Sequence, residues 1–282
     1  MGIIFELLKA ILYGITEGIT EWLPVGSFTH LKLISLVFPQ ALYGASEQAS
    51  FSALFLNVIR LAAVLAVVPF WIGRMNPFVS DSRERRKAGH TWLVVLCALV
   101  PAMISKVILF DMIAERITGI LIPAVLLPVI GVFILLAGSI FRNPPVRTLG
   151  KIPVGAALIC GAVQIFALVP GISHPAAGIT AALALGFTPL CAAEFTILYL
   201  LPLQVYACIR GIIGVSAGLN GIAVITLGLG ALSSFILSVY TAGSFLDYLE
   251  DHDMKLFGIY RILFGAAVLA LLFMKLLPAG GM

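Results

Sequence analysis

Six long apolar segments are the feature that most constrains how this chain can fold. Each is close to the ~20 residues that a helix needs to cross the hydrocarbon core of a bilayer. Only 11% of the 282 residues are charged and 61% are hydrophobic, whereas soluble domains average about 25% charged residues. The sequence therefore predicts an all-α integral membrane protein, in contact with membrane lipids, with about six transmembrane helices. These predicted spans lie at about 51–73, 91–112, 119–141, 188–211, 219–241 and 256–278.

Two further apolar segments are interrupted by proline, and in the first of them the run after the proline, about 28–38, is too short to span a bilayer. The first covers about 3–38 and breaks at Pro24; the second covers 152–186 and breaks at Pro170 and Pro175. Two short helical halves joined by a turn predict a re-entrant hairpin. Such backbone survives at membrane depth only where protein covers it or where it lines a water-filled cavity. The prediction is therefore six transmembrane helices plus two re-entrant helical hairpins.

Each predicted hairpin is followed by three spans, which indicates a duplicated architecture. We expect a single membrane domain, 1–282, with one repeat at about 1–141 and a second at about 152–282. The two hairpins would enter from opposite sides, so the repeat has inverted topology, and such proteins usually hold their site where the halves meet. Four residues of the first repeat have counterparts at similar spacing in the second: Gly14, Glu17, Pro24 and Ser27 correspond to Gly161, Gln164, Pro170 and Ser173.

Two basic segments predict how the chain is oriented in the membrane. They are DSRERRKAGH at 81–90 and RNPPVRTLGK at 142–151, and two predicted spans separate them. Both should therefore lie on one side, which the positive-inside rule identifies as the cytoplasmic side. The net charge of +4 is modest, so we interpret the basic residues as topology signals and expect no nucleic-acid partner.

The first hairpin contains the polar residues that are hardest to explain in an apolar context. Its sequence is GITEGITEWLPVGSFTH, covering 14–30. Glu17 and Glu21 are four residues apart and so share a face of a helix. Burying two acids is costly, and hard cations such as Mg²⁺ and Ca²⁺ favour carboxylate oxygens. The pair could therefore hold a divalent cation or transfer protons, and the alternative is a helix end that dips into the lipid headgroups.

Ser27 and His30 follow the turn after Pro24, where a new helix should begin. The Ser27 hydroxyl could cap that helix. In the functional interpretation, free backbone N–H groups at a helix start bind phosphate, and Ser27 attacks a phosphorus atom if a base takes its proton. His30, one helical turn on, is the candidate acid or base. The alternative for His30 is a hydrogen bond between helices.

The second hairpin offers a matching turn, VPGISHPAAG. The backbone of Gly171, together with Ser173 and His174, would form an anion-binding turn that faces the first hairpin. His174 would carry a positive charge only part of the time at neutral pH, because an ordinary imidazole titrates near pH ~6.5.

Arg60 is a charged residue near the middle of an otherwise apolar span. An arginine at that depth is costly and should face an anion, a carboxylate or water. Lys106 and Glu194 are secondary candidates, and Lys106 is expected toward the end of its span.

These motifs resemble the bacitracin-resistance type of undecaprenyl-diphosphate phosphatase. EGITEWLPVGSFTH resembles the paired-acid motif of that family and the Ser/His segment that follows it. LVPGISHPAAG resembles the family's PGxSRSG turn, and weaker similarity occurs in VIRLAAVLAVV and CAAEFTILYLLP. The order, spacing and hydropathy agree across nearly the whole chain.

The resemblance implies a hydrolase of the bacterial inner membrane that recycles a lipid carrier. Its substrate would be undecaprenyl diphosphate, a polyprenyl diphosphate lipid, whose terminal phosphate is removed for cell-wall peptidoglycan synthesis. The active site would open to the outer, periplasmic side, and a divalent cation, Mg²⁺ or Ca²⁺, would be needed. The residues that match the family's motifs are Glu17 and Glu21 as the paired acids and metal ligands, Ser27 as nucleophile or phosphate ligand, His30 as acid or base, and Ser173 as the serine of the second turn.

The chain departs from the family pattern at several positions. Gly26 replaces one of two serines, and His174 replaces the arginine that grips the phosphate. Pro175 and Ala176 replace the serine and glycine that follow it, and Arg60 stands where the family usually has glutamine. Losing a permanently charged, bidentate phosphate ligand is not a conservative change.

Two hypotheses account for these departures. In the first, Arg60 supplies the missing positive charge and hydrolysis is retained. In the second, the protein is a non-hydrolytic carrier or flippase for polyprenyl phosphate. The sequence leaves open whether Ser27 or a water molecule is the nucleophile, and it leaves the oligomeric state open, a homodimer included.

Overall fold

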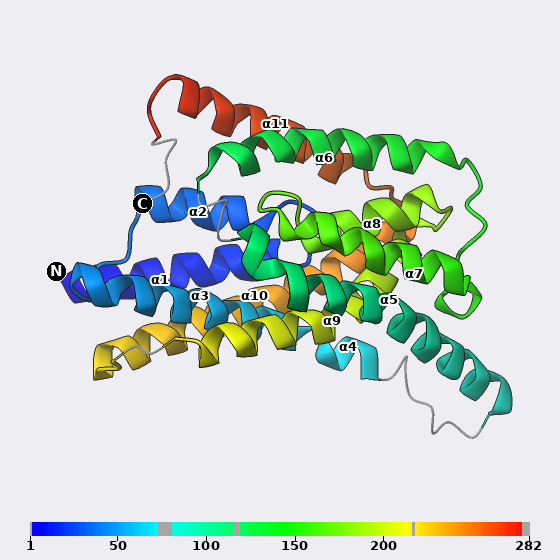
Figure 1. Ribbon diagram of the computed structural model, residues 1–282, viewed down its shortest axis with the longest axis horizontal. Coiled ribbons are helices and arrows are strands. Elements are labelled where there is room, and N and C mark those ends of the chain that lie inside the picture. Colours follow the sequence, from blue (N-terminus) through cyan, green and yellow to red (C-terminus); the bar gives the residue numbers. More distant parts are fainter. Residues whose placement is uncertain (1, 73–80, 115–118, 216–217, 278–282) are drawn as a thin grey trace.

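Figure 1 shows a computed structural model in which long helices run side by side along the longest axis of the molecule. The structure describes residues 2–72, 81–114, 119–215 and 218–277. Within these ranges the regular structure is helical, apart from an isolated β-bridge between Val146 and Phe187. The elements are α1 (Gly2–Thr20), α2 (Ser27–Val37), α3 (Ala45–Ala66), α4 (Val68–Ile72), α5 (Ser82–Ala114), α6 (Leu121–Ile140), η1 (Leu149–Lys151), α7 (Val154–Ala162), η2 (Val163–Leu168), α8 (His174–Ala184), α9 (Pro189–Ile213), α10 (Gly221–Asp251) and α11 (Lys255–Phe273).

Six helical segments in the described part of the chain are long and apolar enough to cross a membrane. They confirm the prediction of an all-α, multi-pass membrane protein with six spans. The span ends predicted at 73 and 278 lie outside the described residues. The six segments are Glu47–Phe70, Ser82–Leu109, Leu121–Ile140, Pro189–Ile213, Gly221–Asp251 and Lys255–Phe273.

The helix α5 begins at Ser82, so most of the basic segment 81–90, expected as a loop, is helical. The Asp81 carboxylate accepts a hydrogen bond from the backbone N–H of Arg83 at 2.8 Å, as a residue that caps a helix does. Lys87 and Glu84, one turn apart, form an ion pair at 2.6 Å. Local capping and charge pairing therefore extend the helix beyond the apolar region that the hydropathy pattern marks.

The helix α10 likewise continues past the predicted end at 241 to Asp251. Phe245 and Leu249, one turn apart in this extension, are both buried. The Phe245 ring packs edge-on against Phe257 of α11, with ring centroids 5.1 Å apart. This apolar face keeps the acidic end of α10 helical.

Both predicted re-entrant hairpins are present. α1 and α2 form the first, while α7, η2 and α8 form the second. In Figure 1 they enter from opposite ends of the molecule, and their turns meet near its centre. The chain leaves helical geometry between Thr20 and Ser27, around Pro24, and again between Leu168 and His174, around Pro170. Proline explains these breaks, because it lacks the backbone donor that a continuous helix needs.

Several contacts between helices are related by the symmetry of an inverted repeat, in which a helix of one half and its counterpart in the other half make equivalent contacts. α1 packs on α10 and α7 packs on α5, while α3 packs on α9 and α6 packs on α11. Gly14 and Gly161, counterparts in the sequence, lie at the equivalent α1–α10 and α7–α5 crossings. A Cβ atom at Gly14 would collide with the backbone oxygen of Gly230, and one at Gly161 with that of Ala98. Glycine permits this close approach of helix backbones, as in many membrane helix pairs.

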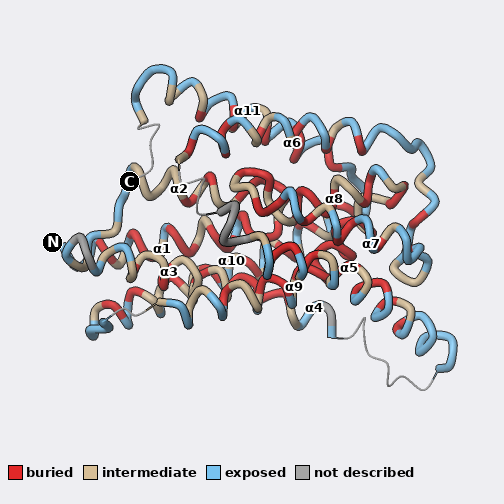
Figure 2. Tube along the Cα trace, in the orientation of Figure 1, coloured by how far each residue is buried: buried red, intermediate tan, exposed pale blue. Residues whose placement is uncertain are grey.

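Burial follows the same plan, with the tips of the hairpins and α9 at the centre (Figure 2). Every residue from 191 to 200 in α9 is buried. On the outward face of α5, Leu96, Val100 and Ile104 are 50%, 56% and 54% exposed. Large exposed apolar side chains at helical spacing mark a surface that faces lipid.

The two basic segments lie at the same end of the molecule. His90 of α5 forms a hydrogen bond through Nε2 with the backbone oxygen of Ile152, at 2.9 Å. Figure 1 shows the start of α5 and the α6–α7 connection at the end away from the N-terminus. This agrees with the prediction that both segments lie on one side of the membrane.

Candidate active site

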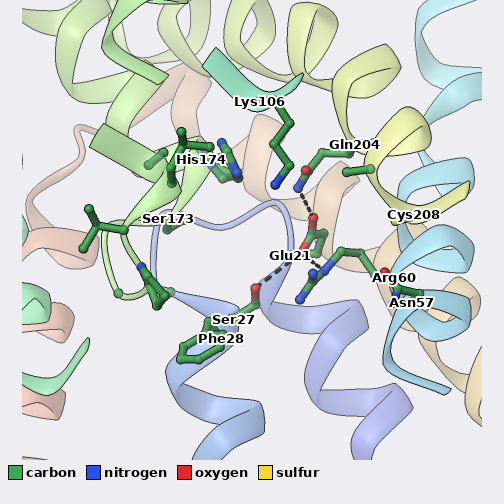
Figure 3. Close-up of a pocket in the computed structure, with 18 residues that line it drawn as sticks. Glu21, Ser27, Phe28, Asn57, Arg60, Lys106, Ser173, His174, Gln204 and Cys208 are labelled. Atoms are coloured by element: carbon green, nitrogen blue, oxygen red, sulfur yellow. Dashed lines mark hydrogen bonds and ion pairs between the residues drawn. The ribbon is translucent and has the colours of Figure 1, made fainter. Parts of the chain in front are cut away.

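A cavity of about 250 Å³ lies where the turns of the two hairpins meet (Figure 3). Its wall is formed by both hairpins and by α3, α5 and α9. It therefore lies at the junction of the two halves, where the sequence predicted the site. The predicted site residues that line it are Glu21, Ser27, Arg60, Gly171, Ser173 and His174.

Glu21 presents its carboxylate to this cavity. Its Oε1 atom accepts a hydrogen bond from Gln204 Nε2 at 2.6 Å. Its Oε2 atom accepts a hydrogen bond from Ser27 Oγ at 3.3 Å, and Oε2 also lies 3.7 Å from Arg60 Nε. The Ser27 hydroxyl therefore points at a carboxylate that can take its proton.

Glu17 lies one helical turn before Glu21, has no exposed surface, and is not among the residues that line the cavity. Its Oε1 atom accepts a hydrogen bond from Arg60 Nε at 2.9 Å. Its Oε2 atom has no hydrogen-bond partner within the part of the chain that the structure describes. Glu17 thus stands behind Arg60 and holds the guanidinium in the cavity wall.

Arg60 contacts both acids and also lines the cavity. Its side chain is 30% exposed, and its Nε atom contacts both Glu17 and Glu21. An arginine in the middle of a span needs such partners, so the expectation that it would face a carboxylate is met. The paired acids and Arg60 form one cluster that joins α1, the first turn and α3.

This cluster determines how a divalent cation would fit. Glu21 offers a carboxylate to the cavity, whereas Arg60 donates a hydrogen bond to the Oε1 atom of Glu17 and the Glu17 carboxylate is buried. Among the described residues, no group of three or more His, Cys, Asp or Glu side chains could complete a metal site. Glu21 thus fits as a cation ligand, whereas Glu17 does not fit while it is paired with Arg60.

Ser27 is the first residue of α2, and it does not cap that helix through its side chain. The preceding Gly26 has φ +90°, a left-handed conformation that glycine adopts without the penalty of a side chain. This backbone directs the start of α2, with its free N–H groups and positive end of the dipole, to the same cavity that Ser27 lines. Of the two roles that the sequence left open for Ser27, capping is therefore excluded.

The second turn brings another helix start to the cavity. Gly171 and Ser173 precede α8 with φ +103° and +72°. A Cβ atom at Gly171 would overlap the backbone of Pro123, so this position requires glycine. A serine with positive φ is strained by about 1–3 kcal/mol, and such strain persists only where the surrounding structure enforces it. The starts of α2 and α8 thus approach one cavity from the two halves.

His174 is held in a defined orientation by a buried glutamine. Its Nδ1 atom lies 2.8 Å from Gln164 Oε1, while Gln164 Nε2 donates to Tyr199 Oη at 2.7 Å and to the backbone oxygen of His174 at 3.2 Å. With the amide oxygen of Gln164 as acceptor, Nδ1 carries the proton and Nε2 is the ring atom that accepts. Gln164, the sequence counterpart of Glu17, thus holds His174 as Glu17 holds Arg60.

The structure does not bring His30 to the cavity. Its Nδ1 atom lies 2.9 Å from the backbone oxygen of Gly26 and its Nε2 atom 2.7 Å from Tyr260 Oη. The ring also stacks on Phe264, with centroids 4.1 Å apart, and lines a different cavity of about 420 Å³. These contacts are the inter-helix role that the sequence left open for His30, and Glu21 rather than His30 contacts the Ser27 hydroxyl.

Comparison with known proteins finds relatives that match nearly the whole chain. The family model described as "Bacitracin resistance protein BacA" matches residues 10–267, which contain the turns of both hairpins. The chain belongs to the BacA family. Undecaprenyl-diphosphatase 1 of Clostridioides difficile is 30% identical over 273 residues, covering 96% of this chain and 98% of that protein. The undecaprenyl-diphosphatases of Enterococcus faecalis and Streptococcus mutans are each 32% identical, over 94% and 97% of this chain and 96% and 98% of their own lengths.

Sequence reasoning did not predict the surroundings of Lys106 in this BacA-family chain. Lys106 lies toward the end of its candidate span, Ser82–Leu109, as expected, but it is only 8% exposed and lines the cavity between the hairpins. The end of this span lies at the centre of the molecule, beside the hairpin tips, rather than at a membrane surface (Figure 1).

Sequence reasoning missed Arg261 entirely. This residue of α11 is fully buried. Its Nη1 atom donates to the backbone oxygen of Pro24 at 3.1 Å, and its Nη2 atom to those of Gly171 at 2.6 Å and Ile172 at 3.2 Å. One guanidinium therefore joins the turns of both hairpins. The signal that could have found it is the one that marked Arg60, an arginine inside an apolar span.

Proposed function

We propose that this protein hydrolyses undecaprenyl diphosphate to undecaprenyl phosphate and inorganic phosphate, and so recycles the lipid carrier of bacterial cell-wall synthesis. The observation that carries the proposal is the hydrogen bond from the Ser27 hydroxyl to the Glu21 carboxylate. This pair lies beside Arg60, in a cavity within a bundle of membrane-spanning helices. The names of relatives that match nearly the whole chain support the choice of substrate.

The cavity has the features that bind a diphosphate. The starts of α2 and α8 supply backbone N–H groups and the positive ends of two helix dipoles. Arg60 supplies a permanent charge on the α3 side. Because these groups are held in place before the reaction, they stabilise the negative charge that develops on the phosphate oxygens.

Glu21 is the group that we assign to proton transfer. Its carboxylate takes the proton from Ser27 Oγ or from a water molecule in the cavity. The attacking oxygen forms a bond to the terminal phosphorus, and the bond from that phosphorus to the bridging oxygen breaks with its electron pair on undecaprenyl phosphate. Where Ser27 attacks, water then hydrolyses the serine phosphate, so either route consumes one water molecule.

A divalent cation remains part of the proposal. Glu21 would hold Mg²⁺ or Ca²⁺ brought in with the diphosphate, and the ion would supply further positive charge at the phosphate oxygens.

The apolar part of the cavity wall suits the lipid end of the substrate. Phe28, Leu168 and Val169 lie beside the polar groups, and we propose that they contact the isoprenoid units nearest the phosphate. We further propose that the protein lies in the bacterial inner membrane with the basic segments in the cytoplasm, and that the cavity opens to the outer side.

The decisive experiment measures inorganic phosphate released from undecaprenyl diphosphate by the purified protein in detergent. The wild type should turn over, and Glu21→Gln should lower kcat by at least about 100-fold, the scale of a lost general base. Lys87→Met, a change at an exposed residue, should leave kcat unaltered. No release by folded wild type that still binds the lipid would contradict hydrolysis and would favour the polyprenyl-phosphate carrier instead.

A further inference from the structure

Lys106 is a second positively charged side chain in the cavity wall, and the reaction described above gives it no part. It lies on α5, within the candidate span Ser82–Leu109, and is buried. A lysine within a membrane helix is costly, up to about 2.5–3.5 kcal/mol at the helix centre on insertion scales. Intramembrane charges of this kind usually serve a functional site, so Lys106 is a candidate for contact with a ligand in the cavity.

Lys106 faces the polar groups from a different wall. In Figure 3 its amine extends into the cavity from α5, beside Gln204, whereas Ser27 extends from the first hairpin on the opposite side. Arg60 approaches from α3, between these two positions. A phosphate group beside the Ser27 hydroxyl would therefore have Arg60 on one flank and Lys106 on the side away from Ser27.

The charges explain why a second cation is needed. Arg60 contacts both Glu17 and Glu21, so acids already balance its charge. A diphosphate adds further negative charge, and an imidazole such as that of His174 does not carry a permanent positive charge. Among the described residues that line the cavity, Arg60 and Lys106 are the arginine and the lysine. An ammonium group is a compact charge that suits phosphate oxygens.

We infer that Lys106 is a phosphate-binding residue, which together with Arg60 clamps the diphosphate from two walls. The inference rests on the proposed function for the identity of the ligand. The cavity then takes molecules with a diphosphate group, and inorganic pyrophosphate is the smallest probe of that group.

The test measures how inorganic pyrophosphate raises the thermal unfolding temperature of the purified protein, because a ligand stabilises the state that it binds. Pyrophosphate should stabilise the wild type. Lys106→Met and Lys106→Gln should weaken the apparent affinity at least about 10-fold, the effect of losing a charge-assisted hydrogen bond. Lys106→Arg should retain most of the affinity because it keeps the charge. The matched control is Lys87→Met, an exposed lysine on the same helix, which should bind as the wild type does.

Several outcomes would overturn the inference. They are wild-type affinity in either Lys106→Met or Lys106→Gln, equal loss in Lys106→Arg, and no stabilisation of the wild type by pyrophosphate. Because both Lys106→Met and Lys106→Gln are tested, the inference can still be contradicted if one of the two variants does not fold. Phosphate release from undecaprenyl diphosphate is measured in parallel. Stabilisation without release contradicts only the hydrolysis, and release without stabilisation contradicts only the role of Lys106.

Discussion

At the scale of single residues, the positive charge of the cavity is placed differently from the family pattern that the sequence resembles. That pattern has an arginine at position 174 and usually a glutamine at position 60, whereas this chain has His174 and Arg60. Both residues line one cavity, and a buried partner orients each, Glu17 for Arg60 and Gln164 for His174. The permanent charge thus lies on α3 instead of the second hairpin, but it faces the same space.

Exchanging the two residues back tests this relocation of charge. Arg60→Gln should lower kcat/KM for undecaprenyl diphosphate by about 100-fold, because charge-assisted contacts to the phosphate are lost. The double variant Arg60→Gln with His174→Arg should regain at least about 10-fold, since it returns a guanidinium to the cavity. Steady-state phosphate release checks both. Wild-type rates in Arg60→Gln, or a double variant no better than the single one, would show that the charge has not been relocated.

The two acids show what a spacing rule can and cannot predict. Their separation of four residues predicted a shared face, and both do contact Arg60. The rule could not predict that Glu21 lines the cavity and Glu17 does not. That difference depends on where α1 ends and on Arg60 of α3, which contacts both acids. His30 shows the same limit, since its partner Tyr260 belongs to a helix 230 residues further along the chain.

At the scale of elements, Arg261 links α11 to the tips of both hairpins. Besides the backbone oxygen of Leu127, it contacts backbone carbonyls of Pro24, Gly171 and Ile172, groups that the broken helices leave without intrahelical donors. In a membrane interior such groups need a partner inside the protein. The turns are therefore stabilised, and held together, by a residue that belongs to neither of them.

Removing this link should destabilise the protein. Arg261→Met should lower the free energy of unfolding by about 3 kcal/mol or more, because several buried carbonyls lose a charged donor. Thermal unfolding in detergent measures the change, and phosphate release should fall with it as the turns separate. Arg86→Met, at an exposed arginine of α5, is the control and should unfold as the wild type does. Unchanged unfolding in Arg261→Met would contradict the role assigned to this residue.

At the scale of the whole molecule, the two ends of the bundle should face different compartments. A cysteine at Arg85, in the exposed basic start of α5, should react with a membrane-impermeant thiol reagent only after cells are opened. A cysteine at exposed Gly44, between α2 and α3 at the opposite end in Figure 1, should react in intact cells. Labelling of both positions in intact cells, or the reverse pattern, would contradict the proposed orientation. Cys97, Cys160, Cys191 and Cys208 are not exposed, so background labelling should be low.

Much of this architecture could be predicted from the sequence, because membrane proteins obey few but strong constraints. Apolar length predicted the spans, and proline with glycine predicted the breaks that form both hairpins. The matched residues Gly14 and Gly161 supported an inverted repeat, and the structure places both at equivalent helix crossings. The positions of Lys106 and Arg261 could not be predicted in this way. The hydropathy of a span does not show which face of the helix lines the cavity, as Lys106 does, or which distant backbone oxygens accept hydrogen bonds from it, as those of Pro24 and Gly171 do from Arg261.

The link through Arg261 also bears on how the protein can move. A flippase that exposes its site first to one leaflet and then to the other would have to draw the two tips apart in every cycle. Here each separation of the tips would remove backbone oxygen partners in both halves from a buried guanidinium, and leaving such groups without partners in a membrane protein is costly. A hydrolase does not need to separate the hairpin turns, because its lipid substrate can enter and leave within the plane of the membrane. The link through Arg261 therefore favours a hydrolase over a protein that moves lipid across the membrane.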